Sequence, residues 1–583
     1  MMQTPGIIFR DRFSESEKSN AQTSHATFEI DGSKKRRMDL GRSRLVLMAL
    51  VFIAVYGVIG MKLTSLAMTD KGDIQRSVRA TNHLMTARPD LVDRNNEVIA
   101  KDLNTYSLHA DPQKIAYPAE ALDKLVRVLP DLDRKKILRR LQGNGKFVWI
   151  KREMTPAQQA RVLELGIPGL TFERETRRFY PGGRVAAHMV GYVDIDNNGL
   201  AGFEKFVDQH WLNNLRQVGF SAEERLEPIA LSVDMRVQHV VRDELSKAME
   251  RYQAIAATGI ILDARTGEVV AMSSLPDYDP NNIRQTFNSN TLNRATAGVF
   301  EMGSTFKALT TAMALDSGLV SLEDSFDARQ PISHAGFKIN DFHAKKRVLS
   351  VPEVFIYSSN IGTVKMALKV GTKKHHSFLD RLGLLKTSSH ELPEVGKPQV
   401  PSEWKKLSSM TISFGHGISV TPLQTLSAVS AILNGGKLIP PTFRPRSLEE
   451  ANEVARQVVS PQTSTMMRYL FRLNVEKGSG KRAEVEGYYV GGKTGTAEKV
   501  VNGSYSKDKR LTSFVSAFPV DDPRYVMLVM IDEPKPLEGQ DAATAGLNAA
   551  PTTAAIIRRV ATTLGLAPRR EELPALTEID YPN

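Results

Sequence analysis

Apolar residues form one uninterrupted block near the start of the chain. Residues 1–33 are polar and lack apolar periodicity, which predicts a flexible tail. No residue from 45 to 61 is charged, and residues 63–68 continue the block beyond Lys62, whose long side chain can place its amine at a membrane surface. This block is long enough to cross a bilayer, so we predict a transmembrane anchor at residues 45–66.

Basic residues before this block predict its orientation. Six of them precede it: Lys34, Lys35, Arg36, Arg37, Arg42 and Arg44. Because positive charge favours the cytoplasmic side, residues 1–44 are predicted to be a cytoplasmic tail, and the rest of the chain to lie outside. A cleavable signal peptide is the alternative, since Ser65-Leu66-Ala67 resembles a cleavage site. The apolar block is longer than a usual signal core, which favours the uncleaved anchor.

Two folded domains are predicted after the anchor. Residues 67–225 show a mixed α/β pattern. Helical periodicity is present at residues 119–129, 133–141 and 155–165. The last of these helices opens with Thr155-Pro156, a capping residue followed by a first-turn proline. A second domain is predicted over residues 226–566, with a C-terminal tail at 567–583.

The pattern of the second domain predicts an antiparallel sheet flanked by helices. Residues 258–262 and 268–273 predict a β-hairpin. Strands at 511–518 and 525–531 are expected to join a strand that carries Lys493, and a helix from about residue 550 to 563 to close the domain. The sheet is therefore assembled from both ends of the domain, and the predicted fold class is α+β.

Composition narrows the classes of site that the chain can hold. At 583 residues it should contain more than one domain, and without cysteine it has no disulfide framework and no thiolate metal site. The net charge of +12 suits an anionic polymer or a membrane surface, although a solvated basic face explains it as well. No phosphate-binding loop and no histidine cluster with ligand spacing is present, so we predict no metal and no cofactor.

The first candidate for chemistry is Ser304-Thr305-Phe306-Lys307. The same S-x-x-K pattern occurs at Ser402–Lys405 and Ser504–Lys507, so the pattern alone is weak. Around Ser304, apolar residues continue at helical spacing until Gly318, whereas Ser504 lies in a polar stretch that predicts a loop. Lys307 shares a helix face with Ser304 and can act as its base only if apolar surroundings, or a cation such as Lys493, lower its pKa from about 10.4.

Two further strings complete the candidate site. Ser358-Ser359-Asn360 is predicted to lie on a connection between two helices, although a capped loop of no function is the simpler explanation for this string alone. Lys493-Thr494-Gly495-Thr496 is predicted to lie on a strand whose glycines allow close approach, and a peptide along its edge would gain main-chain hydrogen bonds. The order and spacing of the three strings together are specific.

With these strings and their surroundings, the chain resembles the class B penicillin-binding proteins, which are peptidoglycan transpeptidases. The surrounding matches are Asn293-Arg294-Ala295, Ser419-Val420-Thr421-Pro422-Leu423-Gln424 and Ala549-Ala550-Pro551. The resemblance implies that Ser304 is acylated by the penultimate D-alanine of a stem peptide, that Lys307 is the base, and that Ser358 passes a proton to the leaving amine. Asn360 would orient Lys307 and hold the substrate amide.

The resemblance also implies a substrate-binding strand. Lys493, Thr494 and Thr496, with Gly495 between them, would bind the carboxylate of the substrate or of an inhibitory β-lactam. The N–H groups of Ser304 and Thr496 would form the oxyanion hole.

Within the family, residues 413–422 and 147–152 resemble the division enzyme more than the elongation enzyme. Met302 departs from the family's usual proline, and Asn96 and Pro89 replace glycines. His416 occupies a position expected to be aromatic, and packing or substrate shaping is favoured over acid/base chemistry.

The resemblance extends to the first domain, as a non-catalytic pedestal, or dimerisation-like, domain. Residues 88–94 and 177–192 match it. A buried ion network is expected from four residues, Arg94, Glu97, Arg177 and Glu204. No glutamate-centred glycosyltransferase motif is present, which argues against a bifunctional enzyme.

The implied location is the inner membrane, crossed once, with a periplasmic catalytic domain. Implied partners are peptidoglycan stem peptides, β-lactams, a septal glycan polymerase and other division proteins, and no nucleic acid. Two other functions stay open. A β-lactam hydrolase or sensor would share the serine site but needs a base for water, and no carboxylate can be assigned to it. A division scaffold with a vestigial site is disfavoured by the three intact motifs.

Overall fold

The computed structural model describes residues 48–62, 88–212, 226–501 and 503–569, in two compact units, Met1–Met85 and Thr86–Asn583. In the first unit, residues 48–62 form a helix whose side chains are all exposed. The predicted tail at 1–44 and the ends of the predicted anchor lie outside the described residues. No helix in the described ranges is both long and apolar enough to cross a membrane.

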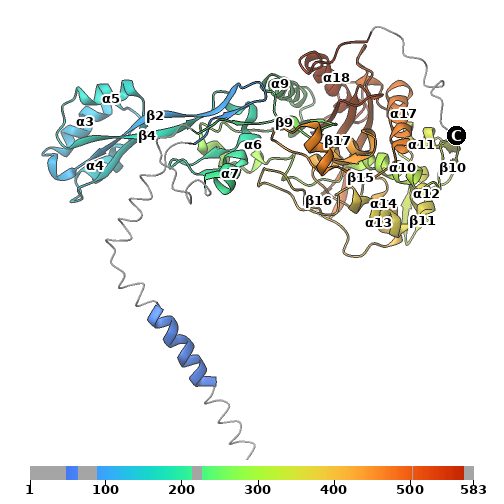
Figure 1. Ribbon diagram of the computed structural model, residues 1–583, viewed down its shortest axis with the longest axis horizontal. Helices are drawn as coiled ribbons and strands as arrows, with labels where there is room; N and C mark the ends of the chain where they lie inside the picture. Colours follow the sequence, from blue (N-terminus) through green and yellow to red (C-terminus); the bar gives the residue numbers. More distant parts are fainter. Residues whose placement is uncertain (1–47, 63–87, 213–225, 502, 570–583) are drawn as a thin grey trace, which may run out of the picture. The chain divides into compact units, whose positions relative to one another are not determined.

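One long strand organises the pedestal domain. Strand β2 (Val98–Ala110) pairs along most of its length with β4 (Leu170–Phe179), near its start with β1 (Leu91–Val92), and near its end with β3 (Val148–Met154) (Figure 1). Strand β7 (Ile229–Ala230), at the start of the predicted second domain, adds to β1 in parallel. The pedestal sheet is therefore continuous with the start of the second domain.

Three helices cover one end of the pedestal sheet, and all three were predicted. They are α3 (Pro118–Val128), α4 (Arg134–Leu141) and α5 (Pro156–Leu163). Thr155 caps α5 in a reciprocal capping box with Gln158, as its position before Pro156 indicated. Their apolar faces enclose a separate core that includes Leu108, Leu125 and Ile150.

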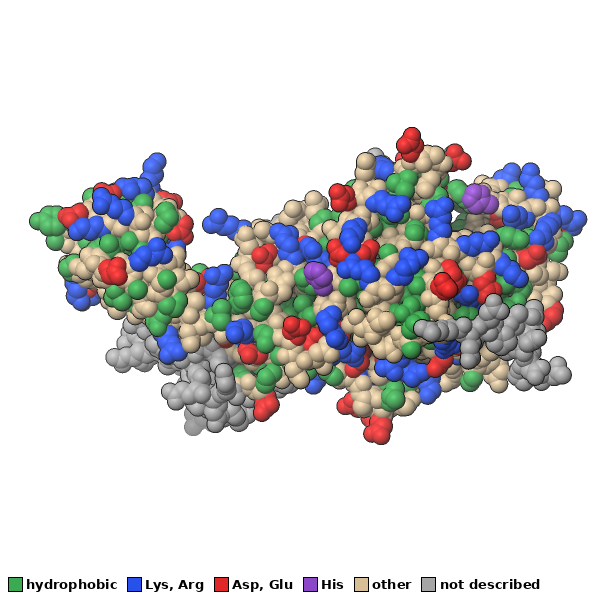
Figure 2. Space-filling view, turned by 90° about the horizontal axis from the view of Figure 1, so that it is seen from above, with side chains coloured by type: hydrophobic (Ala, Val, Ile, Leu, Met, Phe, Trp, Pro, Cys, Tyr) green, Lys and Arg blue, Asp and Glu red, His purple; other side chains and the backbone are tan. Residues whose placement is uncertain are grey.

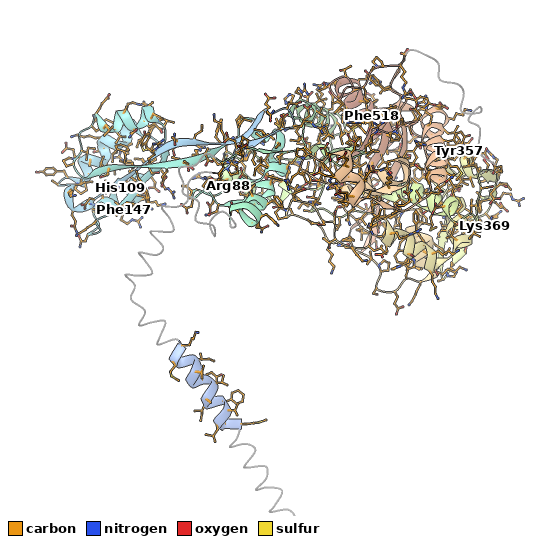
Figure 3. All side chains as sticks on the ribbon, viewed as in Figure 1. Arg88, His109, Phe147, Tyr357, Lys369 and Phe518 are labelled. Atoms are coloured by element: carbon orange, nitrogen blue, oxygen red, sulfur yellow. The ribbon has the colours of Figure 1, made fainter. Side chains whose placement is uncertain are left out.

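A buried ion network lies at the other end of the pedestal, but with different members from those predicted. The fully buried Glu204 accepts hydrogen bonds from Arg178 Nε at 2.7 Å and Arg88 Nε at 2.9 Å, and Asp102 and Asp208 complete the network (Figure 3 labels Arg88).

Only Glu204 of the four predicted members belongs to this network. Arg177 and Arg178 are neighbours on β4, so their side chains point to opposite faces, and it is Arg178 that points inward. Arg177 is instead half exposed beside Glu153, Arg94 pairs with Glu268, and Glu97 is exposed.

A five-stranded antiparallel sheet forms the centre of the second domain, in the order β16-β17-β18-β8-β9. The strands are β8 (Ala256–Asp263), β9 (Val269–Leu275), β16 (Gly491–Val501), β17 (Ser504–Phe518) and β18 (Tyr525–Asp532). The predicted hairpin, and the assembly of the sheet from both ends of the domain, are confirmed. The predicted loop at Ser504–Lys507 is wrong, because these residues begin β17 and pair with the end of β16 beyond a bulge at Glu498/Lys499.

Helices cover both faces of this sheet (Figure 1). Helices α9 (Met235–Arg251) and α18 (Ala549–Val560) share a core with one set of alternate β18 residues, Met527, Val529 and Ile531. Helices α10 (Phe306–Asp316), α15 (Pro422–Leu433) and α17 (Pro461–Lys477) share a core with the other set, Val526, Leu528 and Met530. Burial on both faces explains why β18 is apolar from Val526 to Ile531, before it ends at Asp532.

Shorter elements complete the described chain. The remaining α-helices are α6 (Ala187–Val190), α7 (Gly202–Val207), α11 (Val351–Ile356), α12 (Asn360–Val370), α13 (Thr372–Arg381), α14 (Lys406–Ile412) and α16 (Leu448–Val454), and short 3-10 or π turns lie between the larger elements. Short strand pairs are β5 (Tyr192–Val193) with β6 (Gly199–Ala201), β10 (Ser325–Asp327) with β13 (Val348–Ser350), β11 (Ile332–His334) with β12 (Phe337–Ile339), and β14 (Lys437–Leu438) with β15 (Arg456–Gln457). Figure 2 shows lysine and arginine side chains interspersed with acidic ones over the visible face.

Candidate active site

Ser304 lies in a tight turn that leads into helix α10. The turn, Gly303–Thr305, is a single 3-10 turn, and the Thr305 hydroxyl closes it by donating to the carbonyl of Met302 at 2.8 Å. Lys307 follows one helical turn later and is almost completely buried. Nearly every other side chain of α10 is buried too, so the helix passes through the core and holds the Lys307 amine away from solvent.

Ser358 joins two lysines. It lies between α11 and α12, and its hydroxyl oxygen is 3.1 Å from Nζ of Lys307 and 3.1 Å from Nζ of Lys493. Lys307 also donates to the Ser358 carbonyl at 2.5 Å, and Lys493 to the Thr494 carbonyl at 3.1 Å. The backbone φ of Ser358 is +56°, a left-handed conformation that costs a non-glycine residue roughly 1–2 kcal/mol. The three strings of the sequence therefore meet at one hydroxyl group.

The two lysines are forced toward their neutral forms. Burial lowers the pKa of Lys307 well below its ordinary value, the charge of Lys493 lowers it further, and Asp341 opposes the shift. Burial also lowers the pKa of Lys493 to about 7. Since a hydroxyl has one proton, Ser358 can accept from one protonated amine and donate to the other when that amine is neutral. This arrangement suits proton transfer between Lys307 and a group beside Ser358.

Strand β16 carries Lys493 and lies at the edge of the sheet, next to the Ser304 turn. Two glycines permit this approach. Gly303 has a φ of +52°, and a Cβ atom there would lie 2.7 Å from the Thr496 carbonyl oxygen. A Cβ atom on Gly495 would lie 2.5 Å from Ser513 Oγ and 2.8 Å from the Met302 carbonyl oxygen. The backbones of the serine turn and the edge strand are therefore in direct contact.

The other predicted site residues make local contacts. Thr494 Oγ1 is 2.6 Å from Ser479 Oγ, and Thr496 Oγ1 accepts from the Ala545 N–H at 3.3 Å. The Asn360 amide donates to the Asn340 carbonyl at 2.7 Å. Within the described residues, Lys307 has no hydrogen bond to Asn360 or to the Ser304 hydroxyl, so it is Ser358 that holds the Lys307 amine.

Sequence reasoning missed Asp341, which fixes the Ser358 loop. Its carboxylate accepts from the Ser359 hydroxyl at 2.7 Å and from the Ile361 N–H at 2.9 Å. It thus holds the first turn of α12, where the helix dipole favours a negative charge. No motif includes Asp341, and its separation from Ser359 along the chain gives no signal.

Glu301, three residues before the serine, was also missed. Its Oε1 atom accepts from the Gly417 N–H at 2.7 Å and from the Tyr505 hydroxyl at 3.1 Å. Burial raises the pKa of this carboxyl group. Glu301 therefore ties the end of the β16–β17 hairpin and the loop at 413–417 to the segment that enters the serine turn.

His416 packs within this cluster. Its ring centroid lies 5.2 Å from that of Phe414 and 5.5 Å from that of Tyr505. Burial lowers its pKa to about 4, so it is neutral at neutral pH, which favours the packing role over acid/base chemistry. Within the described ranges, no group of three or more His, Cys, Asp or Glu side chains is placed to hold a metal ion.

Comparisons with known families match both domains. The family described as penicillin binding protein transpeptidase domain matches residues 257–558. The family described as penicillin-binding protein dimerisation domain matches residues 84–221.

Individual relatives match over most of their length. "Probable peptidoglycan D,D-transpeptidase FtsI" of Caulobacter vibrioides is 39% identical over 495 residues, covering 83% of this chain and 82% of its own. "Peptidoglycan D,D-transpeptidase FtsI" of Escherichia coli is 28% identical over 550 residues, covering 90% and 91%. The crystal structure of penicillin binding protein 3 from Mycobacterium tuberculosis, complexed with aztreonam, has a TM-score of 0.63 at 25% identity, covering 83% of this chain and 98% of that one. The chain therefore belongs to the class B penicillin-binding proteins, which combine a dimerisation domain with a transpeptidase domain.

Proposed function

We propose that this protein is a serine D,D-transpeptidase of the FtsI type, which cross-links the stem peptides of septal peptidoglycan and is inhibited by β-lactams. The names of its relatives support the reaction and the role in division. The observation that carries the proposal is the single Ser358 hydroxyl between two buried lysine amines, beside the Ser304 turn and the edge strand. Acyl transfer through a serine needs such a base and proton path.

In the first half of the reaction, neutral Lys307 takes the proton of the Ser304 hydroxyl. Ser304 Oγ attacks the carbonyl carbon of the penultimate D-alanine, and the N–H groups of Ser304 and Thr496 stabilise the resulting oxyanion. The peptide bond then breaks, and Ser358 delivers a proton to the nitrogen of the departing D-alanine while it recovers one from Lys307. An acyl-enzyme on Ser304 and free D-alanine result.

In the second half, an amine of another stem peptide attacks the acyl-enzyme. Lys307 removes the extra proton of the attacking amine, and Ser304 leaves with a proton restored to its hydroxyl. A β-lactam forms the same ester, but its leaving nitrogen stays attached through the opened ring. Protonated Lys493, with the hydroxyl groups of Thr494 and Thr496, binds the ligand carboxylate, and that negative charge raises the low pKa of Lys493. Gly495 keeps this strand close to the serine turn.

A hydrolase needs a carboxylate free to activate water on the acyl-enzyme. Asp341 is not free, because both of its oxygens accept hydrogen bonds, from Ser359 and from Ile361. Within the described residues, Glu301 accepts from Gly417 and Tyr505 through Oε1 alone, so the penicillin experiment below decides between transfer and hydrolysis. An elongation-type enzyme with the same site is the alternative within the family, and the FtsI relatives favour the division type.

The wider organisation is part of the same proposal. A cytoplasmic tail at 1–44 and a single inner-membrane anchor at 45–66 would place the pedestal, 67–225, and the transpeptidase domain, 226–566, in the periplasm, followed by a tail at 567–583. The uncharged block and the exposed apolar side chains of helix 48–62 support the anchor. The two family matches fall inside the two proposed domains. A septal glycan polymerase and other division proteins would be the partners.

Intact-mass measurement after incubation with a penicillin tests the proposal. The wild-type chain should gain one penicillin that stays bound for many minutes, and Ser304→Ala should gain none. Ser402→Ala is the matched control, since Ser402 begins an exposed S-x-x-K string and should leave acylation unchanged. An adduct that forms and is quickly lost would indicate a hydrolase. No adduct on a folded wild-type protein would refute the proposed chemistry.

A further inference from the structure

Residues 337–347, the rim segment, form an exposed basic and aromatic surface beside the site. The segment contains Lys338, Lys345, Lys346 and Arg347 but only one acidic residue, Asp341. Its two phenylalanines are largely exposed, Phe337 at 63% and Phe342 at 66%. Two exposed phenylalanines in one short basic segment offer apolar surface to a partner.

The rim segment is attached to the catalytic loop. Asp341 holds the hydroxyl of Ser359 and the N–H of Ile361, and the Asn340 carbonyl accepts the amide of Asn360. These bonds join the segment to the residues on either side of Asn360. A ligand that lies on the rim segment therefore lies beside the loop that carries Ser358.

Contacts of the rim segment also reach the central sheet. The guanidinium of Arg510, on β17, lies 5.8 Å from the ring centroid of Phe342. The amine of Lys345 lies 4.6 Å from the ring of Tyr357, the residue before Ser358 (Figure 3 labels Tyr357). The rim segment therefore contacts both strand β17 and the residue that precedes Ser358.

Most of the positive charge on the rim segment is unneutralised. Arg347 pairs with Glu353, whereas Lys338, Lys345 and Lys346 form no ion pair within the described residues. A cluster of like charges raises the local concentration of an oppositely charged ligand, over a range of about 8–10 Å at moderate salt. The complementary ligand is an anion that also offers apolar surface to Phe337 and Phe342.

We propose that the rim segment is the docking surface for an uncross-linked peptidoglycan strand. This inference rests on the proposed function, because such a strand carries many stem peptides, each ending in a free carboxylate. The lysines attract these carboxylates, and the exposed phenylalanine rings pack against the C–H faces of the sugars. A small penicillin, with one carboxylate held by β16, does not need the rim segment.

The test compares two reactions of the full-length chain, one with glycan strands and one with penicillin. The probe is a soluble, uncross-linked glycan strand with pentapeptide stems, and the rate of D-alanine release is followed between about 50 and 300 mM salt. The wild-type rate should fall about tenfold over this range, and Lys345→Gln/Lys346→Gln should be several-fold slower at low salt, with a flatter salt dependence. Lys345→Arg/Lys346→Arg should behave as wild type.

One control separates charge on the rim segment from charge in general. Lys373→Gln/Lys374→Gln removes an exposed lysine pair from α13 and should match wild type. A second variant, Phe342→Ala, tests the aromatic part of the surface: it should weaken binding of neutral N-acetylglucosamine oligomers, which the lysine variant should still bind.

Penicillin acylation distinguishes the two proposals. Every variant should be acylated at Ser304 within about twofold of wild type, since the penicillin carboxylate is held by β16 rather than by the rim lysines. Absence of acylation in the wild-type chain would refute the proposed function itself. If the rim lysine variant reacts with strands at the wild-type rate and is still acylated by penicillin, only the proposed docking role of the rim segment is refuted. The docking role would also be overturned if the lysine variant lost strand reaction and penicillin acylation equally, or if the wild-type chain bound anionic lipid vesicles but not strands.

Discussion

Ser358→Ala is the sharpest perturbation of the proposed proton path. It removes the one oxygen that lies 3.1 Å from both Lys307 Nζ and Lys493 Nζ. Each amine keeps a backbone carbonyl as a partner, Ser358 itself for Lys307 and Thr494 for Lys493. The substitution therefore breaks the connection between the amines without leaving either amine wholly unpaired.

The two expected effects differ in size. A hydrogen bond between neutral groups contributes about 0.5–1.5 kcal/mol, so the loss of two such bonds, with carbonyl partners remaining, should lower the free energy of unfolding by about 1–2 kcal/mol. Positioned proton transfer contributes roughly 10²–10⁴-fold to a rate. Acylation should therefore slow by about 100-fold or more, which corresponds to about 3 kcal/mol of lost transition-state stabilisation.

Stopped-flow acylation with a fluorescent penicillin measures the rate, and urea unfolding measures the stability. Ser358→Gly is the matched control, because it also lacks the hydroxyl but relieves the left-handed backbone at φ +56°. Both variants should acylate equally slowly, although the glycine variant should be the more stable. Acylation of Ser358→Ala within about threefold of wild type would refute the proton path. Restored acylation in the glycine variant would assign the loss to backbone strain.

Three further predictions concern charge, approach and the pedestal. The pKa of Lys493 is about 7 in the folded state and about 10.4 in the unfolded state. Between these two pH values the unfolded chain binds more protons than the folded one. The free energy of unfolding should therefore increase with pH over this range, by up to about 1.4 kcal/mol per pH unit. Urea unfolding of Lys493→Met between about pH 7.5 and 9.5 should show a smaller slope than wild type, and equal slopes would contradict the buried amine. Gly495→Ala should slow acylation at least tenfold or so with little loss of folded protein, because its Cβ would press on the Met302 carbonyl at 2.8 Å, and a normal acylation rate would contradict the close contact. Arg178→Ala should destabilise the chain by about 3–5 kcal/mol in urea, whereas its half-exposed neighbour Arg177→Ala should cost under about 1 kcal/mol, and similar losses would contradict the corrected network.

Local periodicity and turn chemistry predicted much of the fold. Thr155-Pro156 indicated the start of α5, and the alternation of apolar and turn residues indicated the β8–β9 hairpin. These features depend on residues close together in the chain, so the sequence contains the signal. The order of the three motif strings likewise indicated one site, and a single hydroxyl, that of Ser358, joins them.

Features that depend on partners far apart in the chain were missed or wrong. Ser504–Lys507 lacks apolar periodicity, yet pairing with β16 makes it a strand. The choice between Arg177 and Arg178 depends on which face of β4 meets Glu204, and adjacent arginines look alike in a sequence. Asp341 could not be connected with Ser359 because only the folded chain brings them together.

The most direct test of the central claim is a transfer assay. The full-length chain is incubated with a soluble donor peptide ending in D-alanyl-D-alanine and a labelled amine acceptor, beside Ser304→Ala. The proposed function predicts that one D-alanine is released for each labelled acceptor joined to the donor, and that both products vanish in the variant. Release of D-alanine without transfer to the acceptor, or product formed by Ser304→Ala, would contradict it.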